Sequence, residues 1–220
     1  LAQCVRTSGL VTRPPREHTK AAASLAPRPA WAIIRHMSDA RNIRPLPKTM
    51  ALIEYGDRTS ALPGLLLDDF EDALGAYARI GGVPSPRRAL ASRHADALVI
   101  ATHARDMREA RYTAIAPGAL VYALIACDAC ETSEARQALE SLEDRLDRTH
   151  ATLAGCALIP LAETLETRMR GPRMGHARRN VSEATDELVL ALRCADEAGI
   201  IDVRPPWPRA LCHLLASRRR

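Results

Sequence analysis

The sequence predicts an all-α protein of seven or eight helices, arranged as an irregular bundle or as stacked helical hairpins. Two observations favour helices over strands. Alanine, which has the highest helix propensity and is uncommon in strands, fills 39 of the 220 positions. Aromatic residues make up only 3% of the chain, and the β-branched and aromatic runs that mark strands are scarce. We therefore expect a core of Leu, Ala, Val and Ile side chains at close helix contacts.

The first 28 residues are expected to form a basic extension, and residues 29–220 a single helical domain. Residues 1–50 hold nine Arg and Lys against two acidic residues, Glu17 and Asp39, with Ser, Thr, Ala and Pro between them. Mitochondrial transit peptides have this composition. Because the chain begins at Leu1 rather than Met, we expect the segment to be retained. A Pro-rich segment cannot build its own core, so it should lie on an external surface.

Apolar residues at helical spacing begin in the first third of the chain. A helical stripe is present over Pro29–Ala40, and a short element is expected over Met50–Tyr55. The clearest helix begins at Pro63 and ends at Gly81-Gly82. A further segment is expected over Arg87–Thr113. The inner face of the helix from Pro63 recurs at three- and four-residue steps, namely Leu66, Phe70, Leu74, Tyr77 and Ile80.

The second half predicts five more helices. The stretch Leu120–Ala129 is apolar on nearly every side, so it is expected to be a central, surrounded helix. A helix capped by Thr132 or Ser133 should follow, and another should cover Cys156–Met169. A further helix over Val181–Ala198 should begin with a capping box of Asn180 and Glu183 and end at Gly199. A short last helix should follow Pro208. The helix after Ser133 has an inner stripe of Ala135, Leu139, Leu142, Leu146 and Leu153.

The dipeptide Ala-Leu stands at positions 89, 123, 157 and 191, a spacing of 34 residues. This is the period of tetratricopeptide-type helical repeats. No Trp, Gly, Tyr or Pro positions recur in register, so a bundle is favoured over a repeat array.

The formal net charge of +5 is unevenly distributed. Residues 1–60 carry +6, residues 61–147 carry −5 and residues 148–220 carry +4. The guanidinium group suits phosphate because it donates two parallel hydrogen bonds. The residues expected to contact RNA or another anion are therefore the arginines of the two basic ends, namely Arg6, Arg13, Arg16, Arg170, Arg173, Arg178, Arg179, Arg218, Arg219 and Arg220.

The acidic run Asp68-Asp69-Phe70-Glu71-Asp72 resembles the D-D-x-x-D motif of class I isoprenoid synthases. In that family, aspartates one helical turn apart hold the magnesium ions that bind a diphosphate, and hard oxygen ligands suit magnesium. The resemblance covers these five residues, and it implies a Mg-dependent diphosphate-handling enzyme. The alternative interpretation is that acidic residues early in a helix complement its dipole and face water.

Cys127-Asp128-Ala129-Cys130 forms a C-x-x-C pair. Without a second closely spaced pair the usual zinc-ligand spacing is missing, so we expect these thiols to pack as small apolar residues of a buried helix. No motif for nucleophilic catalysis or for binding a nucleotide cofactor is present, and no metal and no cofactor are expected. The apolar stretches are too short to cross a bilayer.

These observations predict a non-catalytic structural or interaction subunit of a large assembly, on the matrix side of the mitochondrion. A ribosome is favoured, with arginine clusters on the rRNA backbone and other protein subunits as partners. A supernumerary subunit of a respiratory or ATP synthase complex, the Mg-dependent enzyme, and a viral structural protein from a GC-rich genome are the alternatives.

Overall fold

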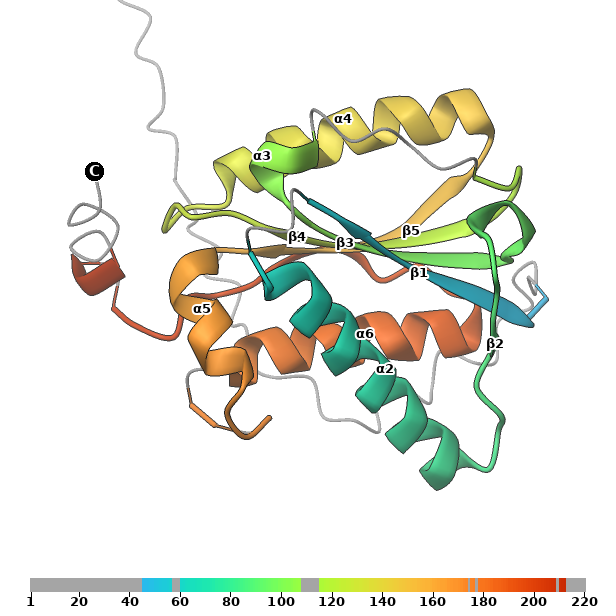
Figure 1. Ribbon diagram of the computed structural model, residues 1–220, viewed down its shortest axis with the longest axis horizontal. Coiled ribbons are helices and arrows are strands. Elements are labelled where there is room, and N and C mark those ends of the chain that lie inside the picture. The colour runs from blue at the N-terminus through green and yellow to red at the C-terminus, as the bar shows by residue number, and fades with distance from the viewer. Residues whose placement is uncertain are drawn as a thin grey trace, which may run out of the picture. The chain divides into compact units, whose positions relative to one another are not determined.

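The computed structural model describes residues 45–56, 60–107, 115–173, 175–176, 178–208 and 210–212. They form a six-stranded, wholly parallel sheet in the order β2-β1-β3-β4-β5-β6, with helices on both faces (Figure 1). The predicted all-α fold was wrong, and the two all-helical arrangements, bundle and stacked hairpins, are excluded with it. The extension over residues 1–28 and the stripe at Pro29–Ala40 lie outside the described residues.

The elements alternate between strand and helix along the chain. The strands are β1 (Thr49–Tyr55), β2 (Arg87–Arg88), β3 (Ala97–His103), β4 (Leu120–Ala126), β5 (Thr152–Ile159) and β6 (Gly199–Asp202). The helices are α2 (Leu62–Gly81), the short 3-10 helix η2 (Ser92–His94), α3 (Ala104–Met107), α4 (Ser133–Thr149), α5 (Ala162–Met169) and α6 (Arg179–Cys194).

The central strands are buried on both faces, and this explains the error of the sequence prediction. Every residue of β3 and β4 is buried. A parallel strand covered on both sides carries a continuous apolar run instead of an alternating one, which resembles a buried helix. The predicted central helix Leu120–Ala129 is therefore β4 and the turn that follows it. The predicted helix Cys156–Met169 is the end of β5 followed by α5.

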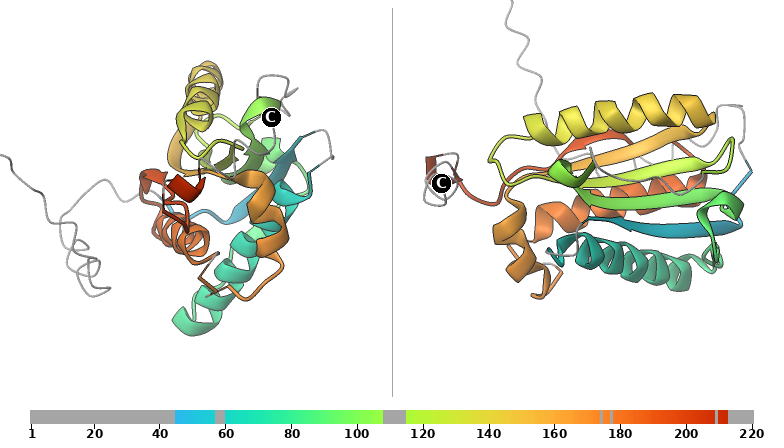
Figure 2. Two further views of the ribbon diagram at one scale, coloured as in Figure 1. Left: turned by 90° about the vertical axis from the view of Figure 1, so that its left-hand side faces the viewer. Right: turned by 45° about the horizontal axis from the view of Figure 1, so that its top comes forward.

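Helices cover the two faces of the sheet in separate layers. On one face α2 packs against α5 and α6, while α3 and α4 pack together on the other (Figures 1 and 2). Side chains alternate between these layers along each strand, as the pleat requires: in β4, Tyr122 and Leu124 face the α2 layer, and Val121 and Ile125 face the α4 layer.

The β5–β6 connection differs in hand from the other helical crossovers. The step from β4 to β5 uses α4 on one face, whereas the step from β5 to β6 continues in the same direction but uses α5 and α6 on the opposite face. Crossovers between parallel strands are right-handed in about 98% of cases. The four-residue β6, at the edge of the sheet, is thus attached with the opposite hand to β5.

Three predicted helices were found, with corrected ends. The helix predicted from Pro63 is α2, and Gly82 ends it in the left-handed conformation at φ 62°. The helix with the stripe Ala135 to Leu146 is α4, although Leu153 lies in β5. The predicted capping box of α6 was wrong: Asn180 lies inside the helix and its side chain donates to Arg204 O, 2.7 Å away. Gly199 begins β6 instead of ending α6, whose last residue is Cys194.

Candidate functional site

The carboxyl ends of β3 and β4 bring together a buried histidine and an aspartate. His103 ends β3 with 3% of its surface exposed, and its Nε2 lies 3.1 Å from Asp128 Oδ1 in the turn after β4. Its Nδ1 accepts a hydrogen bond of 3.3 Å from the Arg105 N–H. Hydrogen bonding from His103, together with the nearby Arg105 charge, lowers the pKa of Asp128 in spite of its partial burial.

Arg105 brings an exposed cation to the same edge. Its guanidinium lies 3.8 Å from Asp128 Oδ2 and 3.6 Å from Asp106 Oδ1. A Cβ atom at Gly56, directly after β1, would lie 3.1 Å from Asp106 Oδ2, so the end of β1 borders this group. We name His103, Arg105, Asp106 and Asp128 the carboxyl-edge cluster.

The first thiol of the C-x-x-C pair, that of Cys127, lies inside the protein. Cys127 follows β4 directly and is fully buried, and burial raises its pKa to about 11. Its Sγ donates to Glu131 O at 3.5 Å. The pair lies after a strand, so the predicted helical setting was wrong. No group of three or more metal-ligating side chains occurs within the described part of the chain.

The acidic run on α2 is divided between solvent and interior. Asp68 and Asp72 are exposed, whereas Asp69 is 1% exposed. Asp69 pairs with the guanidinium groups of Arg173, at 3.0 Å, and Arg178. The buried aspartate therefore joins α2 to the loop before α6, and it serves the packing of the chain itself.

Among the described residues, the arginines that were predicted to contact an anion make different interactions. Arg173 and Arg178 point inward to Asp69, and Arg178 also donates to two backbone carbonyls. Arg179 pairs with Glu183 at 2.7 Å, and Arg170 is exposed. The remaining members lie outside the described residues, namely Arg6, Arg13, Arg16, Arg218, Arg219 and Arg220.

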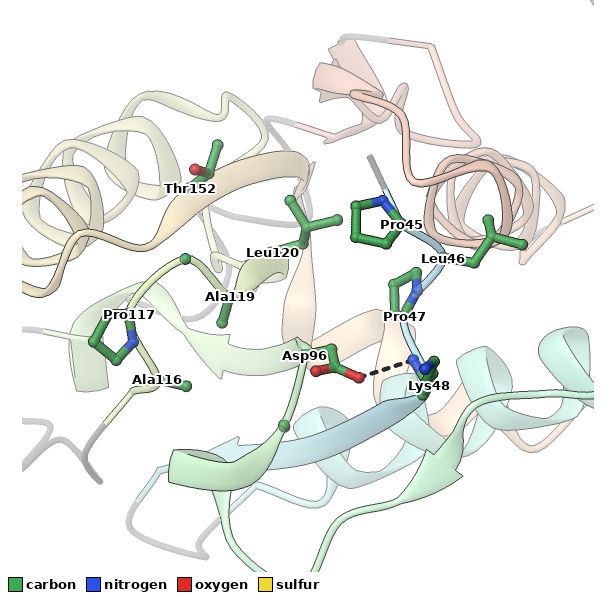
Figure 3. Close-up of a pocket in the computed structure, with 12 residues that line it drawn as sticks. Pro45, Leu46, Pro47, Lys48, Asp96, Ala116, Pro117, Ala119, Leu120 and Thr152 are labelled. Carbon is green, nitrogen blue, oxygen red and sulfur yellow. Dashed lines mark hydrogen bonds between the residues drawn. The ribbon is translucent and has the colours of Figure 1, made fainter. Parts of the chain in front are cut away.

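Two hollows lie at opposite edges of the sheet. One, of about 670 Å³, is at the carboxyl edge and is lined by Cys130, Arg136 and Trp207 among others. There the N-terminus of α4 already holds an internal carboxylate, because Asp202 accepts hydrogen bonds from Thr132 (2.8 Å) and Arg136 (2.6 Å). The other, of about 530 Å³, opens at the amino edge (Figure 3).

Asp96, beside the amino-edge hollow, fixes the start of β1. Its carboxylate accepts hydrogen bonds from the N–H groups of Lys48 (2.9 Å) and Thr49 (3.0 Å) and from the Thr49 hydroxyl (3.0 Å); the bond to Lys48 is drawn in Figure 3. Desolvation alone would raise the pKa of Asp96, but these bonds outweigh it and the pKa lies below its usual range.

Replacing Asp96 by Asn should lower stability in a pH-dependent way. A carboxyl group whose pKa is depressed on folding stabilises the protein above its unfolded pKa, and this contribution is lost as pH falls through the folded pKa. We expect Asp96→Asn to cost roughly 1 kcal/mol in the free energy of unfolding at pH 7. The cost should shrink near pH 3, as urea titrations at the two pH values would measure. A cost equal at both values would contradict the assignment.

Comparison with known proteins adds no relative: no protein-family model and no curated protein matches the chain. None of the helices in the described part of the chain is both long and apolar enough to cross a membrane, as predicted.

The carboxyl-edge cluster was missed by the sequence analysis because His103 and Asp128 are 25 positions apart. They become neighbours only when β3 and β4 pair in parallel, with His103 opposite Ala126. The available signal was a polar residue directly after each of two apolar runs. It has meaning only once these runs are recognised as strands.

Proposed function

We propose that the protein is a non-catalytic binding protein that takes a phosphate-bearing mononucleotide at the carboxyl ends of β1 and β3. The observation that carries this proposal is the strand order. From β1 the chain moves outward to β2 on one side and then returns to β3 on the other, so the order reverses at β1/β3. Open parallel sheets bind ligands outside the carboxyl ends of the strands at such a point.

Two features of the described residues support a phosphate at this position. The 20-residue helix α2 begins here, carries no acidic side chain in its first turn and has no side-chain cap at Ala61. The first-turn N–H groups of a helix attract anions. The guanidinium of Arg105 supplies a cation, since it lies beside Asp106, whose carboxylate borders the end of β1.

Two carboxylates, those of Glu54 and Glu166, compete with a phosphate at this point. A Cβ atom at Gly64, in the first turn of α2, would lie 3.5 Å from Glu54 Oε2, so this side chain already lies beside the helix terminus. The Ser60 hydroxyl accepts a hydrogen bond from the Leu62 N–H (3.2 Å) and donates to Glu166 (3.0 Å). The ligand must therefore be attracted by backbone N–H groups and Arg105, against the charges of Glu54 and Glu166.

The chemistry of the ligand follows from the strand order by analogy of fold. Some sheets with the order 2-1-3-4-5 bind flavin mononucleotide at the β1/β3 reversal. The N–H groups at the start of α2 and the Arg105 guanidinium suit the phosphate of such a molecule. Residues 57–59 and 108–114, which follow β1 and α3 in sequence, lie outside the described part, so no ring site is assigned. No chemical step is assigned to the Cys127 thiol, because burial raises its pKa to about 11.

Calorimetric titration with flavin mononucleotide, AMP and inorganic phosphate tests the proposal. At least one mononucleotide should bind more tightly than phosphate. Removing the cation in Arg105→Ala should weaken that binding about tenfold, and Glu54→Gln should strengthen it several-fold by removing a like charge, since a tenfold change is about 1.4 kcal/mol. Arg148→Ala, at the opposite edge of the sheet, is the matched control. No mononucleotide binding at millimolar concentration, or binding indifferent to both variants, would overturn the proposal.

The mitochondrial assembly, with ribosomal RNA and other subunits as partners, stays a prediction. The inward use of Arg173 and Arg178 leaves fewer of the named arginines for such a contact. Sedimentation of the native protein with and without ribonuclease tests it: comigration with a particle that ribonuclease disperses would support a ribonucleoprotein, and a free monomer would contradict any large assembly.

A further inference from the structure

Exposed apolar side chains gather at one corner of the sheet. Within the described residues six large hydrophobic side chains are exposed, and four of them belong to segments that meet at the amino ends of β1 and β2. Leu90 is fully exposed at 107% of its reference area, and Ile80 is 85% exposed; Val83 and Leu46 are about half exposed. Contiguous exposed apolar surface on a soluble domain usually marks an interaction site.

Exposed basic side chains lie on the same segments of the chain as these apolar residues. The exposed cations are Lys48, Arg79, Arg87, Arg88 and Arg93. They lie on segments 46–48, 79–83 and 87–93. Of them, Arg88 is paired with an acidic side chain, Glu71, at a loose 3.6 Å. The carboxylate of Asp96 accepts hydrogen bonds from the N–H group and the hydroxyl of Thr49 at the start of β1.

The backbone places these segments side by side. The Arg87 N–H donates to Lys48 O and the Ala89 N–H donates to Met50 O, each at 2.8 Å, so Leu90 follows a strand that lies directly against the start of β1. Segment 80–86 connects the end of α2 to that strand. In both Figure 1 and the right panel of Figure 2, the end of α2 and the start of β1 lie at the same end of the sheet. We name Leu46, Lys48, Ile80, Val83, Arg87, Arg88 and Leu90 the amino-edge corner.

We propose that the amino-edge corner binds the surface of an anionic lipid membrane peripherally. A partner must bury apolar side chains and neutralise cations together, and a bilayer of anionic lipids does both. The shape favours lipid over an acidic protein, because Leu90 and Ile80 are far more exposed than Leu46, which lines the neighbouring hollow together with Lys48. That hollow, of about 530 Å³, is lined by neither Leu90 nor Ile80. Protruding aliphatic side chains enter the headgroup boundary while flanking arginines remain at the phosphates.

Co-sedimentation of the full chain with unilamellar vesicles tests the proposal. Vesicles of phosphatidylcholine alone should bind little protein, whereas vesicles with about a quarter phosphatidylglycerol should bind it in a salt-sensitive way. The double variant Ile80→Ser/Leu90→Ser should lower the partition coefficient at least about tenfold, because two aliphatic side chains would no longer be buried in the bilayer. Arg87→Gln/Arg88→Gln should lower it by a similar factor, because two cations that attract the anionic lipids are removed.

The control separates this corner from the other basic and apolar parts of the chain. Ile200→Ser changes an exposed isoleucine on β6, at the far edge of the sheet, and should leave binding unchanged. If the two corner variants bind like the unmodified protein, the attraction arises elsewhere, for example from the basic residues before position 45, and the proposal is wrong. Absence of binding to the anionic vesicles, or capture of an acidic protein by the same residues in place of lipid, would also overturn it. Mononucleotide binding at the opposite edge is unaffected by either result.

Discussion

Replacing Asp69 by Ala is expected to lower the free energy of unfolding by about 3–5 kcal/mol, the largest effect of any single substitution considered. Asp69 is 1% exposed and pairs with two guanidinium groups, those of Arg173 and Arg178. The Ser182 hydroxyl also donates to it at 3.4 Å. Removing the carboxylate leaves two cations facing each other in a partly buried site, and an unpaired buried charge costs far more than the ion pair itself contributes.

The position of Asp69 in the fold increases this effect. Its carboxylate on α2 holds the loop between α5 and α6, and Arg178 simultaneously donates to the carbonyls of Met169 and Gly171 at the end of α5. Three helices of one layer therefore depend on one side chain. Urea unfolding followed by circular dichroism measures the change, with the slope of the transition as a check that the unfolding remains two-state.

Asp186 provides the matched control. It also pairs with Arg173, at 2.6 Å, but burial together with the nearby charges of Asp69 and Glu183 raises its pKa, although Arg173 opposes the shift. Its ionised form thus gains little from this environment. We expect Asp186→Asn to change the free energy of unfolding by less than about 1 kcal/mol. Equal losses in the Asp69 and Asp186 variants would show that Asp69 has no special role.

How far the sequence predicts this fold depends on whether an element is amphipathic. In α2 and α4 one face is apolar and the other charged, and this 3.6-residue period has no counterpart in a strand, so both helices were predicted. In β3 and β4 no period is left because both faces are covered. Alanine strengthened the error: Ala97, Ala101 and Ala123 lie in strands, where small side chains let helices approach the sheet.

The candidate site was beyond sequence reasoning for a related reason. His103 ends β3 and Asp128 follows β4, so the pairing of these strands brings the two together, and Arg105 and Asp106 follow His103 in α3. Conversely, the acidic run from Asp68 to Asp72, which resembles a metal-binding motif, combines exposed side chains with a structural ion pair. Spacing alone cannot distinguish Asp69 from Asp68, because the difference lies in which arginines the α5–α6 loop brings to the helix.

The second large effect is expected at Gly155, where α6 packs closely against β5. A Cβ atom at this buried position in β5 would lie 2.8 Å from Leu188 Cδ2 of α6 and 2.9 Å from Ala198 Cβ. Neither neighbour can yield easily: Leu188 is fully buried, and the Ala198 N–H donates to Ala154 O at 2.8 Å. Overpacking a close-packed core forces backbone shifts that typically cost about 1–3 kcal/mol, and we expect Gly155→Ala to fall at the upper end.

The same Gly→Ala substitution at Gly75 is expected to change stability in the opposite direction. It lies inside α2, where an added Cβ would meet only Arg79 NH1, at an ordinary 3.6 Å. Because alanine restricts the unfolded chain and favours helix, Gly75→Ala should raise stability by about 0.5–1 kcal/mol. Thermal and urea unfolding of the two variants compare one methyl group in two environments. If Gly155→Ala were neutral or stabilising, α6 could not lie as close to β5 as described, and the layer that contains Asp69, Arg173 and Arg178 would have to be placed differently.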